Sequence, residues 1–240
     1  MDNYLVTGGS FGIGREVVQS LIEKGYKVFN LDIKEPEKIL DNEVFIKHDL
    51  KYYHCIKNII PTQKYKGLFL NVGVHKSGTI FSQSLEEIEN LMSINLLSNI
   101  AVIKALENNF QDNSSIVFNG SDQCFIGKTT NFAYGMTKGA IAQITKSLAK
   151  DLAPLKIRVN TICPSTTRTP LYEDAMIRMA NREGVTVEEA KEMENKIFPL
   201  NRIAEPKEIA NAVCFLLSDE SIAMTGTLLP IDGGYTATNM

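Results

Sequence analysis

The sequence predicts an α/β protein in which a doubly wound parallel sheet forms a single domain over residues 1–240. Short apolar runs of strand length alternate along the chain with segments of helical period. The first run is followed at once by a glycine-rich turn and then by a helical pattern. Polar or glycine residues follow most of the other runs, as they do where parallel strands present ligand-binding residues at their carboxyl ends.

Seven strands are expected, with helical patterns between most of them. The stretch over 33–66 is short and predicts only a reduced helix, whereas 171–198 is long enough for two helices joined near Gly184. No repeat, low-complexity tract or linker divides the chain, which supports one domain. The strands are expected near residues 3–7, 27–31, 44–47, 67–71, 115–119, 157–162 and 227–231.

The glycine-rich turn is TGGSFGIG at Thr7–Gly14, and the helix that follows it is expected over 15–24 and ends at Gly25. Glycine lets the backbone turn tightly and approach a pyrophosphate, while free N–H groups at the helix start attract the anion. An ATP-type phosphate loop is excluded because Arg15 and Glu16 stand where Lys and Ser or Thr would be required. The turn therefore predicts a dinucleotide site.

Asp32 ends the second expected strand, eighteen residues after Gly14. A carboxylate at this position can accept hydrogen bonds from the adenosine ribose hydroxyls and would repel a 2′-phosphate. Lys34 is the only nearby cation in the sequence. The pattern favours NAD over NADP as the cofactor.

Tyr134 and Lys138 are four residues apart in YGMTK, with Ser121 thirteen residues before the tyrosine. On a helix this spacing places the phenol and the ammonium on one face, where the cation can favour the phenolate. A tyrosine with a lowered pKa is able to transfer protons near neutral pH. The pair therefore predicts an acid/base centre.

These motifs, in this order, resemble those of the short-chain dehydrogenase/reductase family, whose compact members have a single Rossmann-like domain. The resemblance covers nearly the whole chain. TGGSFGIG resembles the family's TGxxxGxG, Asp49-Leu50 its adenine-contacting acidic pair, Asn71-Val72-Gly73 its NAG, and Asn95 in MSINLLSN its asparagine. Ser121, Tyr134 and Lys138 complete the resemblance to its catalytic tetrad, Ile157–Pro164 resembles its sixth strand, and Thr225–Tyr235 its closing segment.

The resemblance assigns expected roles to the tetrad. Tyr134 is the general acid/base, and Lys138 lowers the pKa of Tyr134 and binds the nicotinamide ribose. Ser121 holds the substrate oxygen, and Asn95 holds a water in a proton relay behind Lys138; the alternative for Asn95 is an asparagine that bonds its own helix backbone. The residues expected to bind the cofactor are Gly8, Ser10, Phe11, Gly12, Ile13, Gly14, Asp32, Asp49, Leu50, Asn71, Val72, Gly73, Tyr134, Lys138, Pro164, Thr167 and Thr169.

Three residues depart from the family pattern. Ser165 stands where glycine is usual, Thr167 where Ile or Val is usual, and Leu70 where the first asparagine of NNAG is usual. None removes a reacting group, but Ser165 is tolerated only at negative φ. At Thr167 the backbone, rather than the side chain, is expected to matter.

The segment 171–198 is expected, by resemblance, to form a substrate lid. Its Met and Ile side chains suit either the core or an apolar part of the pocket, and its charged residues suit a solvated face. Gln123 and Phe125 are expected to line the substrate pocket together with the lid. One sequence does not reveal the shape of that pocket, and therefore not the substrate.

Composition excludes several other classes. The net charge is −3, with 25 basic against 28 acidic residues and no basic cluster, so no nucleic-acid partner is expected. No apolar run has the length of a membrane span, and the strand signal near residue 3 leaves no room for a signal peptide, so a cytoplasmic location is expected. The four cysteines and three histidines show no metal-ligand or disulfide spacing, and the histidines are expected to be surface residues.

The sequence thus predicts an NAD-dependent oxidoreductase that acts on a secondary alcohol or ketone and, by resemblance, forms a homotetramer. One alternative is an NADPH-dependent ketoreductase, for example of a 3-oxoacyl thioester, against which Asp32 argues. A non-catalytic dinucleotide-sensing protein is a second alternative, and it predicts loss of Ser121, Tyr134 or Lys138, all of which are present.

Overall fold

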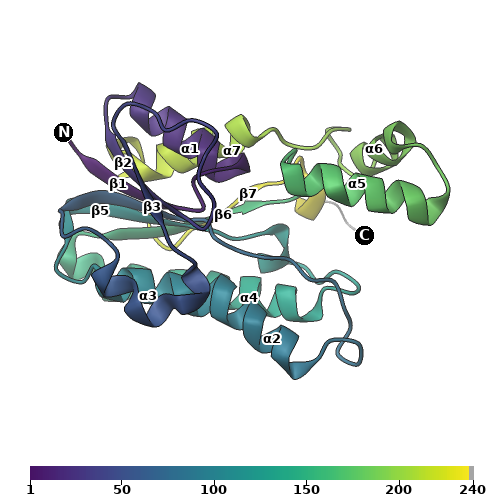
Figure 1. Ribbon diagram of the computed structural model, residues 1–240, viewed down its shortest axis with the longest axis horizontal. Helices are drawn as coiled ribbons and strands as arrows, with labels where there is room; N and C mark the ends of the chain where they lie inside the picture. Colours follow the sequence, from purple (N-terminus) through teal and green to yellow (C-terminus); the bar gives the residue numbers. More distant parts are fainter. Residues whose placement is uncertain (238–240) are drawn as a thin grey trace.

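The computed structural model describes residues 1–237, and its centre is a seven-stranded parallel sheet (Figure 1). The strands lie in the order β3-β2-β1-β4-β5-β6-β7. The chain adds β2 and β3 on one side of β1 and then crosses over to place β4 on its other side. Ligands of open parallel sheets bind at such a reversal, next to the carboxyl ends of the strands. The strands are β1 Asn3–Thr7, β2 Lys27–Asp32, β3 Glu43–Lys47, β4 Tyr65–Leu70, β5 Phe110–Asn119, β6 Arg158–Pro164 and β7 Leu228–Ile231.

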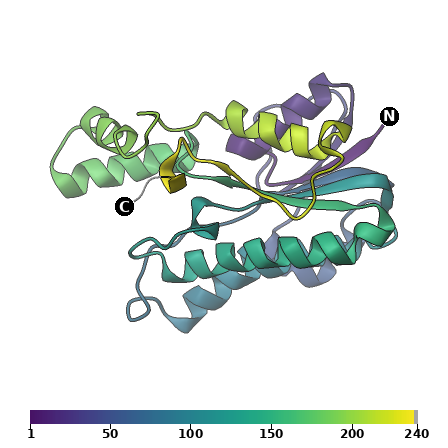
Figure 2. The same ribbon diagram turned by 180° about the vertical axis from the view of Figure 1, so that it is seen from behind.

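Helices cover both faces of the sheet. Helices α1 (Gly12–Glu23) and α7 (Pro206–Leu217) lie on one face, and α2 (Leu85–Met92), α3 (Ser98–Ala105) and α4 (Phe132–Asp151) lie on the other (Figures 1 and 2). Between β3 and β4 the chain forms only a kinked 3-10 helix, η1, at Leu50–Asn58, as the short sequence there predicts. The Rossmann-like, single-domain α/β prediction is confirmed.

Two further helices, α5 (Pro170–Glu183) and α6 (Val187–Asn195), extend beyond the carboxyl ends of the strands. Gly184 joins them in a left-handed conformation, with φ 70°, and caps α5 through its N–H bond to the Ala180 carbonyl. The two helices expected near this glycine are therefore present. We refer to residues 170–195 as the lid segment.

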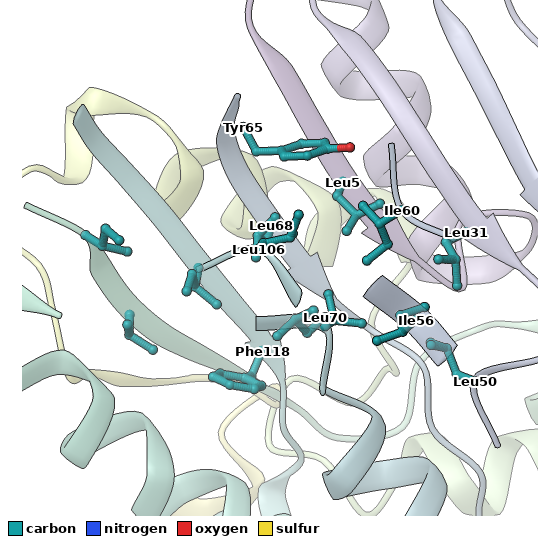
Figure 3. Packing of buried hydrophobic residues seen from close by; sticks show 14 of the residues in the cluster. Leu5, Leu31, Leu50, Ile56, Ile60, Tyr65, Leu68, Leu70, Leu106 and Phe118 are labelled. Atoms are coloured by element: carbon teal, nitrogen blue, oxygen red, sulfur yellow. The ribbon is translucent and has the colours of Figure 1, made fainter. Parts of the chain in front are cut away.

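Three apolar clusters hold these layers together. One lies between the sheet and the layer of η1, α3 and α4, and Figure 3 shows Leu5, Leu68, Leu70 and Phe118 among its buried side chains. The second lies between the sheet and helices α1 and α7. The third is a small cluster that packs the lid segment against the residues following it, formed by Tyr172, Met176, Ala180, Ala190, Phe198 and Ile203.

The expected strands are confirmed, with small differences at their ends. β5 begins at Phe110, five residues before the expected start, because Phe110 pairs with Tyr65 of β4 before the register shifts and Ser115 pairs with Gly67. α1 begins at Gly12, inside the glycine turn, rather than at Arg15. Over residues 1–237 no helix is long and apolar enough to cross a membrane.

Candidate active site

A pocket of about 1080 Å³ opens at the carboxyl ends of the strands, between the glycine turn and the lid segment. Helix α5 lines it with Leu171, Ala175, Arg178, Met179 and Arg182, which recur at helical spacing. Of the residues predicted from sequence, the pocket brings together Phe11, Gly12, Ile13, Asn71, Gly73, Ser121, Tyr134, Lys138, Pro164, Thr167 and Thr169. The remaining predicted residues, Gly8, Ser10, Gly14, Asp32, Asp49, Leu50, Val72 and Asn95, lie behind or beside this surface and do not line it.

Glycine is required at the turn by both conformation and space. Gly8 and Gly12 have φ of 67° and 54°, in the left-handed region. A Cβ at Gly14 would lie 1.9 Å from the Gly8 carbonyl oxygen. Gly12 and Ile13 line the pocket, so the start of α1 faces it, and the free N–H groups of a helix start suit a pyrophosphate.

Asp32 is fixed beside this turn. Its Oδ2 accepts a hydrogen bond from the Ser10 N–H at 3.0 Å, and its Oδ1 accepts one from the Lys34 N–H at 3.1 Å. Each carboxylate oxygen keeps a further lone pair for another donor. The side chain is thus oriented by the backbone and remains able to accept hydrogen bonds from hydroxyl groups.

Asn71 connects the turn to the centre of the sheet. Its Nδ2 donates to the Gly8 carbonyl at 3.0 Å, and its Oδ1 accepts from Asn119 Nδ2 at 2.8 Å. Its backbone N–H donates to Thr7 Oγ1 at 2.9 Å. By contrast, Asp49 caps η1 and accepts a local hydrogen bond from the Lys51 N–H at 2.9 Å.

Tyr134 and Lys138 lie in the first turns of α4, as their spacing predicts. The Lys138 Nζ atom is 5.5 Å from the centroid of the Tyr134 ring and donates to the Asn119 carbonyl at 2.7 Å. Ser121 caps the 3-10 helix η3 (Asp122–Cys124) after β5, and its hydroxyl lies close enough to the Tyr134 phenol to lower the pKa of that group. Phenol, hydroxyl and ammonium therefore meet on one wall of the pocket.

The pKa values in this group differ from expectation. Burial raises the pKa of Tyr134 above its usual value, and the negative charge of Asp122 adds to this rise, while the Ser121 hydrogen bond opposes it. Burial also lowers the pKa of Lys138 to about 8. Burial of the phenol thus opposes the lowering of the Tyr134 pKa that the sequence predicts from Lys138.

Asn95 is fully buried in a π-helical turn, η2 (Ser93–Leu97), between α2 and α3. Its Oδ1 accepts from the Val74 N–H at 2.8 Å, and its Nδ2 donates to the Val74 carbonyl at 2.9 Å. The side chain therefore bonds the loop after β4 rather than its own helix. Single π turns are frequent at functional sites, and this one aligns Asn95 with the strand end next to Gly73.

His75 is exposed, as the sequence predicts, and it also lines the pocket, which the sequence analysis did not foresee. Its ring packs edge-on against Tyr134, with centroids 4.9 Å apart. Its Nε2 lies 2.6 Å from Asn131 Oδ1, and Asn131 Nδ2 donates to the Thr129 carbonyl, which fixes the amide orientation. Nε2 therefore carries a proton. The sequence feature that could have placed His75 in the pocket is its position four residues after Asn71, on the loop that leaves β4.

The residues that depart from the family pattern fit without strain. Ser165 is not at positive φ, and its Oγ donates to Asp122 Oδ2 at 2.5 Å. Thr167 lines the pocket, and its hydroxyl donates to the Ser165 carbonyl at 3.2 Å. Gln123 and Phe125 do not line the pocket, contrary to expectation, since Gln123 is buried and Phe125 points to solvent.

Comparison with known proteins agrees with this geometry. A family model described as enoyl-(acyl carrier protein) reductase matches residues 8–236. Oxidoreductase UcpA of Salmonella typhimurium is 31% identical, over 97% of this chain and 93% of its own length. The NADP-dependent (R)-specific alcohol dehydrogenase of Lentilactobacillus kefiri is also 31% identical, over 97% of this chain and 96% of its own.

Solved structures are similar over the whole chain. A short chain dehydrogenase family protein from Francisella tularensis is 52% identical, with a TM-score of 0.95, and the match covers 99% of this chain and 100% of that one. The family match, the curated relatives and this structure agree with the pocket described above, so the chain is an oxidoreductase that belongs to the short-chain dehydrogenase/reductase family.

Proposed function

We propose that this protein is an NAD-dependent oxidoreductase that interconverts a secondary alcohol and a ketone, with Tyr134 as the general acid/base. The observation that carries this proposal is the meeting of Tyr134, Ser121 and Lys138 on one wall of a pocket whose other end is the glycine turn. A proton-transfer group and a dinucleotide cradle in one cavity provide both halves of an alcohol oxidation.

Each residue then has a role that its contacts support. Tyr134 removes the hydroxyl proton of the alcohol, or returns it to the ketone in the reverse direction. Ser121, held at the cap of η3, bonds the substrate oxygen on which charge changes. Lys138 is fixed by the Asn119 carbonyl, and its ammonium lies over the face of the phenol ring, 5.5 Å from the centroid. The nicotinamide, when bound, supplies the hydride acceptor or donor.

The residues around the glycine turn fit a dinucleotide. Side chains at Gly8 and Gly14 would collide with Asn71 and with the Gly8 carbonyl, so glycine keeps the turn tight, and the N–H groups of α1 suit a pyrophosphate. Thr167 and Thr169 line the pocket beside the turn, with the Thr169 methyl next to Gly12, and we assign the carboxamide end to these two residues by family resemblance. We assign the adenosine ribose to Asp32, and the adenine to Asp49 and Leu50 by family resemblance.

Two observations favour NAD over NADP. The Asp32 carboxylate stands where it would repel a 2′-phosphate. Arg15, the arginine next to the turn, is occupied: its Nη1 lies 2.8 Å from Glu43 Oε1, and its Nη2 donates to the Lys38 carbonyl at 2.6 Å. A guanidinium already paired with a fully buried carboxylate is not free to bind phosphate.

The test is titration of the purified protein with NADH and with NADPH, followed by cofactor fluorescence. We expect tighter NADH binding, and we expect Asp32→Ala to weaken NADH more than NADPH. Glu35→Ala, an exposed acidic residue three positions further on, serves as the control and should change neither affinity. Equal losses for both cofactors in Asp32→Ala would overturn the assigned role of Asp32.

A second candidate is an NADPH-dependent ketoreductase, which the NADP-dependent Lentilactobacillus relative favours. Tighter binding of NADPH than of NADH in the same titration would favour the ketoreductase. Binding of neither cofactor would favour a non-catalytic protein instead. Substrates are then sought with the preferred cofactor and a panel of alcohols: isopropanol, cyclohexanol, xylitol and glucose.

The proposal includes a cytoplasmic homotetramer, as the family resemblance implies. Large apolar side chains exposed before and in α2, namely Ile80, Phe81 and Leu85, are consistent with contacts between chains. Light scattering after size-exclusion chromatography should give the mass of four chains. A monomer at micromolar concentration would remove this part of the proposal.

A further inference from the structure

Asp122 directly follows Ser121 and is almost fully buried, with 1% of its side chain exposed. Its Oδ1 lies 2.9 Å from the Ser121 hydroxyl. Its Oδ2 accepts from Lys128 Nζ at 2.7 Å and from Ser165 Oγ at 2.5 Å. Burial of a carboxylate lowers the stability of a fold unless hydrogen bonds and an opposite charge compensate it. The three side-chain donors to Asp122 provide this compensation.

Those donors come from three different segments. Ser121 is at the end of β5, Lys128 is on the loop between η3 and α4, and Ser165 follows β6. The Lys128 ammonium also lies 4.7 Å from the centroid of the Tyr235 ring near the C-terminal end of the described chain. Asp122 therefore joins the strand ends that carry the pocket, and its charge is partly compensated from the side away from Ser121.

The protons in this network can be assigned. An ionised carboxylate only accepts, so in its contact with Asp122 the Ser121 hydroxyl is the donor. The Ser121 oxygen accepts from the Gln123 N–H at 3.2 Å and is also within hydrogen-bond reach of the Tyr134 phenol. Tyr134, Ser121 and Asp122 thus form a chain that ends on a negative charge.

We propose that Asp122 is a positioning residue for the Tyr134 reaction: it orients the Ser121 hydroxyl, and its charge, offset by Lys128, sets the pH at which Tyr134 acts as a base. This inference rests on the proposed function. The charge of Asp122 disfavours the phenolate, whereas the charge of Lys128 partly cancels it. The two residues should therefore shift the activity profile in opposite directions.

Other groups that can carry charge also face Tyr134. Lys138 lies one turn along α4, His75 packs against the ring from the loop after β4, and Cys124 faces it from η3. None of these changes in the variants below, so their contributions to the profile are common to all of them. The difference between variants therefore reports the charges at 122 and 128.

The experiment measures kcat/KM for alcohol oxidation against pH, with whichever alcohol of the panel is turned over. We expect Asp122→Asn to move the acidic limb to lower pH by about one pH unit, because loss of the negative charge favours the phenolate. We expect Lys128→Met to move the limb to higher pH, by a smaller amount because this side chain is 28% exposed. Ser165→Ala removes one contact of Asp122 and no charge, so the limb should stay in place.

A purely structural role for Asp122 would lower kcat/KM at every pH without moving the limb, and that result would overturn the inference. Shifts of equal sign in Asp122→Asn and Lys128→Met would also overturn it, as would complete loss of turnover in Asp122→Asn with normal NADH binding and melting temperature. If Asp122→Asn misfolds, the pH profile of Lys128→Met decides: an acidic limb that does not move to higher pH would overturn the inference. Failure of the proposed function is separate: it would appear as near-normal turnover in Tyr134→Phe.

Discussion

At the scale of single residues, Lys138 carries a cost that its place in the fold explains. Its ammonium is buried among β5 and α4, and its pKa falls to about 8 from an ordinary 10.5. Between these values the unfolded chain binds a proton that the folded chain does not, so stability rises as pH rises through this window. A buried ammonium that lowers stability at neutral pH does not serve packing, and its place beside Tyr134 in the pocket gives it a function.

We therefore predict that Lys138→Met is more stable than the parent protein at pH 7, by roughly 3 kcal/mol from the difference between the two pKa values. The gap should narrow as the pH rises from about 8 towards 10. Urea unfolding at several pH values measures it. Lys146→Met, an exposed lysine on the same helix, is the control and should show no such pH dependence. A gap that is constant with pH would contradict the burial of a charged Lys138.

The roles of Asp122 and His75 could not be predicted from the sequence, because their contacts come from distant parts of the chain. Asp122 reads as a turn residue after a strand, and its three donors come from positions up to 43 residues away. His75 meets Tyr134 only because the loop after β4 and the start of α4 share one end of the sheet. The chemistry of Tyr134, Lys138 and Ser121 could be predicted from spacing, but the pKa of Tyr134 could not, because burial depends on the packed fold.

At the scale of elements, the lid segment is a separate packing unit. Its buried side chains form their own cluster around α5 and α6 and do not belong to the two sheet clusters. Phe198, with 5% of its surface exposed, packs in this cluster against the Tyr235 ring. Such a unit can open without unfolding the sheet.

We predict that Phe198→Ala destabilises the lid segment by about 3–5 kcal/mol, the usual cost of a large buried deletion. Hydrogen exchange should then become faster in α5 and α6, while β1, β4 and β5 keep their protection. Ile197→Ala, at a neighbouring position that is 49% exposed, should leave exchange unchanged. Equal loss of protection in the sheet would mean that lid and sheet unfold together.

The helices and strands were the part of the structure that the sequence predicted best. The strands, the glycine turn and the two lid helices follow from apolar period and glycine position, which act locally. The π turn at Ser93–Leu97 could not be predicted, since it depends on the bonds between Asn95 and the Val74 backbone, 21 residues apart.

At the scale of the whole molecule, the crossover between β1 and β4 brings the functional residues together. Asp32, Asn71, Ser121 and Pro164 are spread over more than 130 residues, yet each stands at or just after the carboxyl end of a strand of one parallel sheet. One rim thus holds a dinucleotide cradle and a proton-transfer centre. The lid segment closes the far side of the same pocket.

The measurement that tests this account most directly is turnover of Tyr134→Phe beside its affinity for NADH. The substitution removes only the phenolic oxygen, so we predict a fall of about a hundredfold or more in kcat and nearly unchanged NADH binding. Phe132→Leu, two residues earlier on an exposed part of α4, is the control and should keep its turnover. Near-normal turnover in Tyr134→Phe with the same alcohol would contradict Tyr134 as the acid/base and with it the proposed mechanism.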